Sequence, residues 1–398
     1  MEWKEVTLGD FMQCNPKRTI KKGQKARKIT MDLLIPHSKT IRNWNYEPYS
    51  GGAKFQNGDT IMARITPCLE NGKHAFVSIL DEGEIAYGST EYFVFCGKEK
   101  VSDNDFVYYL TKTPLFRDTA IKSMVGSSGR QRAQMDVLEN LKMFVPKDIS
   151  DQRRIASILS SLDRKIELNN KINADLEEMA QAIFKNWFVD FEPFKGGKFV
   201  DSELGMIPEG WKVGRLGDIT KNKSAKVKER NDVKVLSPVT TGELVLSEEY
   251  FTKQVFSSSI AKYKIVNKGD FAYNPARVNI GSLGRNEFDF DGCVSPVYVV
   301  FSVLDGYENY FDLFRKTDFF KDSVASLAIG GVRQSLSYDD LSSIEVIIPS
   351  ENAVEEFNNL YNQMKKTIKA NKLESSRLST LRDTLLPRLM SGELEVPE

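Results

Sequence analysis

Residues 151–187 read DQRRIASILSSLDRKIELNNKINADLEEMAQAIFKNW, and the periodicity of this stretch decides the fold. Two series of mostly apolar residues recur every seven positions, and neither Pro nor Gly interrupts them. The two series are Ile155, Leu162, Asn169, Leu176 and Ile183, then Leu159, Ile166, Asn173, Ala180 and Trp187. Such spacing is typical of the a and d positions of a coiled-coil helix. We therefore predict one long helix over residues 151–190.

A second long helix is predicted over residues 350–398, including a short tail. Each of its seam positions follows a counterpart in the first helix by 202 residues: Phe357, Met364, Asn371, Leu378 and Leu385. Asn371 repeats the polar position of Asn169, and a polar residue at an a position commonly fixes the register of paired helices. If the two helices pack antiparallel, these two Asn side chains should meet. Pro387 should break or kink the second helix.

The sequence before each long helix is one unit written twice. Trp3-Lys-Glu-Val-Thr-Leu-Gly-Asp-Phe11 returns 208 residues later as Trp211-Lys-Val-Gly-Arg-Leu-Gly-Asp-Ile219. Gly58-Asp59 returns as Gly269-Asp270. Self-similarity of this kind indicates a duplicated structural unit.

Each globular segment reads as mixed but rich in strands. Glu91–Phe95 and Val297–Phe301 contain the aromatic and β-branched residues that favour strands. Short amphipathic helices are expected around residues 105–124 and 307–327. The predicted fold class is α+β, with two tandem mixed α/β, strand-rich domains joined by two long antiparallel coiled-coil helices in a pseudo-two-fold internal repeat. The predicted boundaries are 1–150 for the first domain, 151–190 for its helix, 191–349 for a linker plus the second domain, and 350–398 for the second helix.

The composition limits the possible functions. Lys and Arg number 55 and Asp and Glu also number 55, so a protein that coats nucleic acid through a generally basic surface is disfavoured. Four scattered Cys and two His leave little material for disulfides or a His/Cys metal site. The first residues lack the pattern of a signal peptide, and no apolar run approaches the roughly 20 residues that span a bilayer. A cytoplasmic protein is expected.

A basic stretch occurs at the same place in both repeats. In the first repeat no acidic residue lies between Phe11 and Met31. The candidate DNA contacts are Lys17, Arg18, Lys21 and Lys22 in the first repeat, and Lys221 and Lys223 in the second. A recurring basic loop suits contact with DNA phosphates. A solvated surface loop is the alternative interpretation.

An Arg-Gln pair beside Gly residues also recurs. Gly126-Ser-Ser-Gly-Arg-Gln131 is echoed by Gly330-Gly-Val-Arg-Gln334, so the candidate residues are Arg130 and Gln131, and Arg333 and Gln334. Arg can bind a guanine edge through two hydrogen bonds, and Gln can bind an adenine edge in the same way. The alternative is a turn whose side chains brace the fold, and the recurrence favours bracing. Arg64 and Arg277 carry the same two interpretations.

Catalytic motifs are missing. The sequence contains no Gly-x-x-x-x-Gly-Lys-Ser/Thr loop for a nucleoside triphosphate. Asn274-Pro-Ala-Arg277 lacks the second Pro and the aromatic of a methyltransferase motif, and Asp232-Val-Lys234 is too short to identify a nuclease. A self-contained nuclease or methyltransferase is therefore the weaker alternative to a DNA-binding subunit. A scaffold that does not bind DNA is a third.

Several stretches together resemble the specificity subunit of type I restriction-modification systems, the HsdS family. They include Ala63-Arg-Ile-Thr-Pro-Cys-Leu-Glu-Asn-Gly-Lys73, Gly88-Ser-Thr-Glu91, and the long run from Gln152 to Asn169 that continues through Met179–Phe188. Leu381-Arg-Asp-Thr-Leu-Leu-Pro-Arg-Leu-Met-Ser-Gly392 is also typical of the family. The resemblance covers essentially the whole chain.

The resemblance implies a non-catalytic subunit that binds double-stranded DNA. Each globular segment would be a target recognition domain that reads one half of a split site, and the helices would form a spacer. Two modification subunits would dock there and bring S-adenosylmethionine for adenine-N6 methylation. Restriction subunits would add cleavage that depends on ATP and Mg. This chain itself is expected to hold no cofactor and no metal.

The length of the predicted helix agrees with this implication. From Ile155 to Trp187 a helix would rise about 48 Å at roughly 1.5 Å per residue. DNA half-sites one helical turn apart are separated by about 34–36 Å. Two domains at opposite ends of such a rod could address adjacent turns of one groove.

Overall fold

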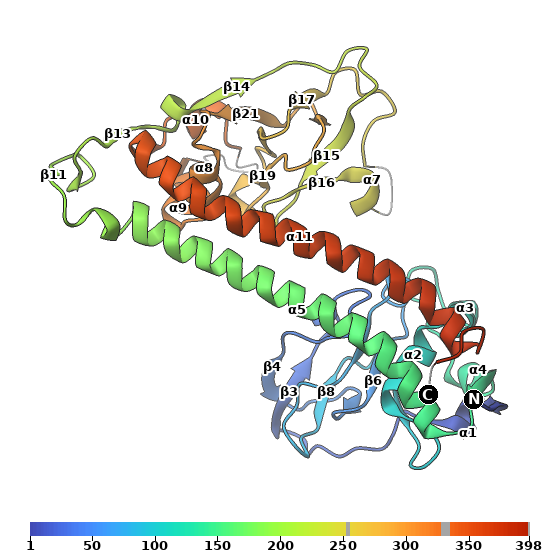
Figure 1. Cartoon of the computed structure of the whole chain (residues 1–398). Helices are drawn as coiled ribbons and strands as arrows, with labels where there is room; N and C mark the ends of the chain where they lie inside the picture. The colour runs from blue at the N-terminus through green and yellow to red at the C-terminus, as the bar shows by residue number, and fades with distance from the viewer. Residues whose placement is uncertain (252–254, 328–334, 397–398) are drawn as a thin grey trace. The chain divides into compact units, whose positions relative to one another are not determined.

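The computed structural model describes residues 1–251, 255–327 and 335–396 (Figure 1). The chain forms two compact units. The first contains Met1–Asn173 together with Lys369–Glu398, and the second contains Ala174–Ile368. Each unit therefore combines one globular segment with parts of both long helices, a division that boundaries drawn along the sequence do not express.

The two long helices are α5 (Ile149–Phe188) and α11 (Glu351–Met390). The expected break at Pro387 is wrong, because α11 continues through this residue. A Pro removes one N–H from the helical ladder, and here only the last turn of α11, which ends at Met390, follows it. The turn that follows is closed by the Ser391 N–H, which donates to the Pro387 carbonyl at 3.1 Å. None of the described helices is both long and apolar enough to cross a membrane.

Two four-stranded sheets form the framework of the first unit. Their strands are β2 (Met12–Cys14), β3 (Lys25–Ile29), β4 (Asn45–Pro48), β5 (Lys54–Phe55), β6 (Thr60–Ala63), β7 (His74–Phe76), β8 (Ala86–Gly88) and β9 (Tyr92–Gly97). One sheet has the order β2-β9-β6-β7 and the other the order β4-β3-β8-β5. Neighbouring strands are antiparallel except β3 and β8, which are parallel. A separate antiparallel pair joins β1 (Trp3–Thr7) to β10 (Lys142–Pro146).

Strand β9 separates two hydrophobic cores of the first unit. Alternate side chains of a strand point to opposite faces. Phe93 and Phe95 accordingly join the core that contains the helices, and Tyr92 and Val94 join a second core against β6 and β7. All four side chains are buried. An unbroken aromatic and β-branched run is therefore the expected sequence for this central strand.

Short helices complete the first unit: α1 (Leu8–Phe11), η1 (Met31–Leu33), α2 (Asn104–Lys112), α3 (Pro114–Lys122) and α4 (Met135–Glu139). The helical region expected around residues 105–124 is divided into α2 and α3. The division lies at Thr113, because the residue before a Pro is disfavoured in the helical conformation. The Thr113 side chain then caps α3 by accepting a hydrogen bond from the Phe116 N–H.

The second unit repeats this framework. Its strands are β14 (Thr220–Lys223), β15 (Lys234–Pro238), β16 (Leu244–Leu246), β17 (Lys264–Val266), β18 (Phe271–Tyr273), β19 (Leu283–Arg285), β20 (Gly292–Val294) and β21 (Val299–Val303). The sheet orders are β14-β21-β18-β19 and β16-β15-β20-β17. The β15–β20 pair is parallel, as is β3–β8 in the first unit. The predicted α+β class with two strand-rich domains and paired long helices is confirmed.

The remaining elements of the second unit lie around these sheets. They are the pairs β11 (Phe199–Val200) with β12 (Ile207–Pro208) and β13 (Lys212–Arg215) with β22 (Glu345–Ile348), and the helices η2 (Glu192–Phe194), α6 (Leu216–Ile219), α7 (Ser247–Tyr250), η3 (Val278–Ile280), α8 (Glu308–Phe314), α9 (Asp318–Leu327) and α10 (Tyr338–Ser342).

Within the first unit, the beginning of α5 packs beside the end of α11 (Figure 1). Ile155 and Leu159 of α5 share a core with Leu386 and Leu389 of α11, and all four are buried. This core also contains helix α2 and one face of β9. The helices are thus part of the domain core rather than a separate rod beneath it.

The polar seam of the helix pair differs from the prediction. Asn169 and Asn371 do not bond to each other. The Asn169 amide donates to Glu374 Oε2 at 2.7 Å, and the Asn371 amide donates to Asn173 Oδ1 at 2.9 Å. The register of the antiparallel pair, which the spacing within each helix does not determine, places a different residue opposite each Asn.

The ten predicted seam residues are all buried or half-buried. Ile155, Asn169 and Phe357 are buried, and Leu162, Leu176, Ile183, Met364, Asn371, Leu378 and Leu385 are half-buried.

A buried ion pair crosses the helix pair in the first unit. Arg382 Nη1 donates to Asp163 Oδ1 at 2.6 Å, and the two side chains are only 5% and 7% exposed. Tyr109 of α2 donates its hydroxyl to the other oxygen of Asp163, also at 2.6 Å. Asp163 therefore ties α5 to α11 and to the globular domain at once.

The segment at residues 39–42 fastens the domain to α5. Lys39 Nζ donates to Ser160 Oγ at 2.8 Å. Thr40 Oγ1 donates to one oxygen of Glu167 at 3.0 Å, and Arg42 binds both oxygens of that carboxylate at 3.1 and 3.0 Å. These contacts limit rotation of the domain about the helix.

Aromatic packing takes this role in the second unit. Phe184 and Phe188 of α5 lie against Phe357 of α11, with ring centroids 6.2 and 5.0 Å apart. Tyr310 of α8 joins them, 5.1 Å from Phe188. Asn309 donates its amide to Asn358 and Asn362 of α11 at 2.9 and 3.0 Å. The second domain is thus fastened to its helices mainly by apolar and neutral contacts.

The Asp163–Arg382 pair generates a stability prediction. Arg382→Met leaves a buried carboxylate without its cation, so the free energy of unfolding should fall by about 3–5 kcal/mol. Asp163→Asn added to Arg382→Met should restore much of the loss, because the amide oxygen still accepts from Tyr109. Urea unfolding of both variants measures this. The matched control is Arg377→Met, an exposed Arg of α11, and an equally large fall for Arg377→Met would contradict the assignment.

Candidate nucleic-acid interface

A buried Asp follows the same Gly in both repeats. Asp59 and Asp270 are 1% and 4% exposed. One oxygen of each accepts the backbone N–H three residues earlier, that of Gln56 at 2.8 Å and that of Asn267 at 2.9 Å. The repeated Gly-Asp motif therefore builds a turn that leads into β6 in the first unit and into β18 in the second.

Each of these carboxylates is neutralised by a cation from the basic stretch. Arg18 donates to Asp59 at 2.9 and 2.5 Å, and Lys223 donates to Asp270 at 2.7 and 2.9 Å. Burial raises the pKa of both Asp carboxyls, and the cation beside each opposes this rise. The Arg18 side chain is only 13% exposed. Arg18 and Lys223 thus stabilise the fold and leave the set of candidate phosphate contacts.

The other basic candidates are exposed. Lys17, Lys21 and Lys22 lie in the loop between β2 and β3, and Lys221 lies on the edge strand β14. Among the residues that the structure describes, none of the four forms an ion pair. Their ammonium groups are therefore available to an anionic partner.

The Gly-rich loop at residues 126–131 is closed by backbone hydrogen bonds. Val125 and Arg132 exchange both N–H···O bonds at 3.0 Å. Gly126 has φ of 135°, and a Cβ there would lie 2.9 Å from the Arg130 carbonyl. Only Gly fits such a position. Arg130 is exposed and Gln131 is half-buried on this loop.

The brace of this loop is Arg132, the residue after the predicted pair. Its guanidinium binds both oxygens of Glu91 at 2.8–3.0 Å, and Arg64 Nε binds the same carboxylate at 3.1 Å. The hydrogen bond from Arg132 is the main cause that lowers the pKa of Glu91. Arg64 also lies over the Phe93 ring, 5.6 Å from its centroid. Arg64 therefore braces the fold.

Within the described residues the Arg130 side chain makes none of the contacts that a brace would need. Its side chain is exposed, and no hydrogen bond or ion pair of its guanidinium is formed within the described part of the chain. Its backbone carbonyl accepts from Arg132 at 3.2 Å. The loop is held from its base, which leaves Arg130 projecting from a fixed backbone.

The second unit lacks this brace. Counted along the paired strands, Val297 takes the place of Glu91, and its side chain is 70% exposed. Arg277, in the place nearest to Arg64, is exposed and forms no ion pair among the residues described. Arg333 and Gln334 lie outside the described residues.

In the first unit, the two loops that carry candidate DNA contacts are hydrogen-bonded to different sheets. The basic loop is bonded to the sheet β4-β3-β8-β5: the Gly23 N–H donates to the carbonyl of Tyr49 at 2.9 Å, and Lys54 of β5 donates to the Arg18 carbonyl at 3.1 Å. The Gly-rich loop is bonded to the other sheet through Glu91, directly before β9. Phosphate contact and base reading would thus fall to separate parts of the unit.

Two exposed aromatic residues, Trp44 and Tyr46, are further candidates for DNA contact that the sequence analysis did not identify. Trp44 and Tyr46 are 42% and 63% exposed, Tyr46 pairs with Arg27 across β3 and β4, and Arg27 lies 4.9 Å from the Trp44 ring centroid. Exposed aromatics beside cations are common where proteins stack on nucleic-acid bases. The signal was the alternation Trp44-Asn-Tyr46, in which one large aromatic lies directly before the edge strand β4 and the other lies on it.

The faint nuclease motif has another explanation. Asp232 is held by Arg230 at 2.7 and 2.9 Å, and Lys234 lies over the Phe290 ring. Arg230 lowers the pKa of Asp232 by hydrogen bonding. Across the described ranges no group of three His, Cys, Asp or Glu side chains is arranged to hold a metal ion.

Comparison with known proteins finds relatives of one kind. The family model described as the type I restriction modification DNA specificity domain matches residues 1–178. The MjaIX specificity subunit of Methanocaldococcus jannaschii is 29% identical over 74% of this chain and 70% of that protein. The HindI specificity subunit of Haemophilus influenzae is 25% identical over 99% of this chain and 100% of that protein.

A solved structure supports the fold. The crystal structure of the type I restriction-modification system S subunit from M. genitalium aligns with a TM-score of 0.53 at 16% identity, over 98% of this chain and 96% of that one. Sequence relatives and fold thus agree along the whole chain. Residues 1–178 thus match the type I restriction modification DNA specificity domain, and the whole chain is similar in sequence and in fold to specificity subunits of type I restriction-modification systems.

Proposed function

We propose that the chain reads a two-part double-stranded DNA site, with one half bound by each globular segment. The observation that carries this proposal is the duplication: two sheets of the same order, with the same parallel pair, occur twice in one chain. A duplicated unit mimics the two-fold axis of a homodimer and lets the two halves diverge. A single chain can then read an asymmetric site.

The two units offer different chemistry to their half-sites. In the first, Arg130 projects from a loop that Glu91 and Arg132 hold in place. In the second, the corresponding carboxylate is replaced by the exposed Val297, and Arg277 is unpaired among the described residues. A fixed Arg suits two hydrogen bonds to a guanine edge, whereas an exposed Val suits the methyl group of thymine. The half-sites should therefore differ.

Phosphate contacts would supply most of the affinity. Lys17, Lys21, Lys22 and Lys221 are exposed ammonium groups on structured loops or strand edges. Cations that neutralise phosphates release counterions, which makes binding strongly dependent on salt. The neutral overall charge does not oppose this, because the binding energy comes from local groups.

The long helices would set the distance between the half-sites and carry the partners. Exposed apolar side chains on them include Leu168, Met179, Leu373 and Leu381. Two modification subunits docked there would bring S-adenosylmethionine and methylate adenine at N6. Restriction subunits would add translocation and cleavage that depend on ATP and Mg. This chain would supply recognition alone and hold no cofactor.

The direct test is to express the chain with its neighbouring modification gene and to map methylated adenines by single-molecule sequencing. The proposal predicts one split motif with two different halves. An unsplit motif, or methylation by the purified chain without its partner, would contradict it.

The phosphate contacts give a prediction about salt. Lys17, Lys21 and Lys22 changed together to Ala should weaken binding about equally on all sequences. The slope of log affinity against log salt should shrink by roughly one unit for each phosphate that is no longer neutralised. Gel shifts of the assembled methyltransferase at several salt concentrations measure this.

Arg18→Ala is the matched control for the salt experiment. It should lower the free energy of unfolding by about 3–5 kcal/mol, because Asp59 is left buried without its cation. For the Arg18→Ala protein that remains folded, the slope of log affinity against log salt should equal that of the parent. A reduced slope for Arg18→Ala, with the slope of the Lys variant unchanged, would reverse these assignments.

Arg130 and Arg132 should separate specificity from stability. Arg130→Ala should relax the methylated motif at one position, with a cost of about 1–3 kcal/mol against the cognate site, and should leave the melting temperature unchanged. Arg132→Ala should lower the melting temperature, because it removes the main partner of Glu91. Methylome mapping and thermal unfolding of both variants decide. The same motif with a lower melting temperature for Arg130→Ala would restore the bracing interpretation.

A further inference from the structure

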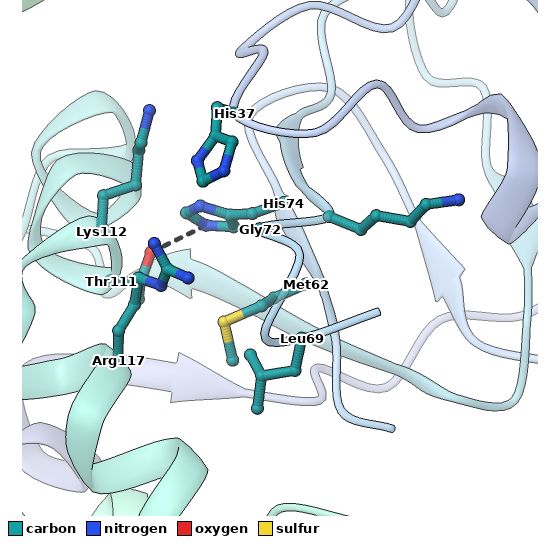
Figure 2. Close-up of a pocket in the computed structure, with 9 residues that line it drawn as sticks. His37, Met62, Leu69, Gly72, His74, Thr111, Lys112 and Arg117 are labelled. Carbon is teal, nitrogen blue, oxygen red and sulfur yellow. Dashed lines mark hydrogen bonds between the residues drawn. The ribbon is translucent and has the colours of Figure 1, made fainter. Parts of the chain in front are cut away.

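A small cationic pocket lies in the first unit, and its lining includes no residue of the loops described above (Figure 2). Its cavity of about 20 Å³ has room for one water-sized group. His37, His74, Lys112 and Arg117 are among its lining residues, and no acidic side chain lines it. A pocket with this lining is suited to a negatively charged oxygen.

The Lys112 ammonium is buried without a hydrogen-bond partner. It lies over the face of the Tyr108 ring, 5.4 Å from the ring centroid. Burial, followed by the positive charge of Arg382, lowers the pKa of Lys112 to about 8. A buried polar group left without a partner is costly, and native proteins normally satisfy it.

The walls of the pocket are fixed. The Thr111 hydroxyl donates to the Tyr108 carbonyl at 2.9 Å, so it accepts from His74 Nε2 at 3.0 Å. The ring of His37 lies over Gly72, where a Cβ would come within 2.5 Å of it. Arg117, which also lines the pocket, donates one N–H to the Glu70 carbonyl at 3.1 Å. The side chains of His74, Thr111 and Arg117 are thus held in place before any ligand binds.

The charges around Lys112 do not cancel. Arg117 faces it from α3, Asp163 from α5, and Arg382 and Asp383 from α11. Both carboxylates are already bound by Arg382, at 2.6 and 2.8 Å. With Lys112, three cations face two anions, so one positive charge is left without compensation.

We propose that this pocket binds an anionic oxygen of a phosphate group. The source is either a phosphodiester of the bound DNA or a free phosphate ion, and the chemistry of recognition is the same for both. Binding of a DNA phosphodiester rests on the function proposed above, whereas binding of a free phosphate ion does not depend on that function. The cavity admits one oxygen, so the rest of the phosphate would lie at its mouth.

Proton linkage gives the proposal a pH dependence. Burial and the cations Arg117 and Lys112 lower the pKa of His37, and burial lowers that of Lys112. An anion in the pocket opposes these shifts and favours the protonated forms. Phosphate should therefore bind less tightly as the pH rises through about 8, where the Lys112 ammonium loses its proton.

The test uses thermal unfolding of the full chain with inorganic phosphate, against chloride at equal ionic strength. At ten times the dissociation constant, phosphate should raise the melting temperature by about 3–6 °C at pH 7. Lys112→Met should abolish this rise. It should also melt higher than the parent without phosphate, because it removes a buried unpaired charge. Lys122→Met, an exposed Lys of α3, is the matched control and should keep the phosphate effect.

Three results would overturn the proposal. They are a rise that chloride reproduces, a rise that Lys112→Met retains, and a rise that is as large at pH 9.5 as at pH 7.

DNA binding by the assembled methyltransferase then identifies the source of the phosphate. If the source is DNA, Lys112→Met should reduce the slope of log affinity against log salt by about one unit. If it is a free ion, this slope should be unchanged while phosphate stabilisation is still abolished. An assembly that binds no DNA would refute the proposed function but leave the phosphate result standing.

Discussion

The antiparallel packing of α5 on α11 brings the end of the chain back to its beginning, and the first unit depends on it. Ile155 and Leu159 are buried in a core that also contains Leu386 and Leu389, so this core needs both helices. Asp163 likewise needs Arg382 from 219 residues later. In the second unit Phe184 and Phe357 play the same part. Each globular domain is thus assembled from two distant pieces of sequence, and neither domain is complete without the pairing of both helices.

Within each domain the charged groups fall into two classes. Buried carboxylates such as Asp59 and Asp270 need a cation, and the fold supplies Arg18 and Lys223 for that purpose. Exposed cations such as Lys21 and Arg130 have no such partner among the described residues. Because removal of a cation from a buried pair costs far more than removal of an exposed one, the first class must be kept in every repeat. On the proposed function, the second class is free to change with the DNA sequence that is read.

Sequence reasoning predicted the features that depend on period and repetition. The seven-residue spacing indicated both long helices, and the 202-residue offset indicated the duplication. Features that depend on which side chains meet could not be predicted. Asn169 and Asn371 occupy matching positions, yet the antiparallel register gives them Glu374 and Asn173 instead of each other. The sequence around Arg18 predicted a phosphate contact. It gives no sign that Arg18 binds the buried Asp59, because that partner lies 41 residues away along the chain.

The central proposal is that the length of the helix pair sets the spacing between the two half-sites of the DNA. One heptad inserted between Asn173 and Ala174, and another between Ile368 and Lys369, falls at the boundary of the units and keeps the packing within each. Seven residues preserve the a/d seam and add about 10 Å, or roughly three base pairs. Methylome mapping of this variant should show both half-sites unchanged, a longer spacer and weaker activity. Altered half-sites, or an active variant with the original spacer, would contradict the account.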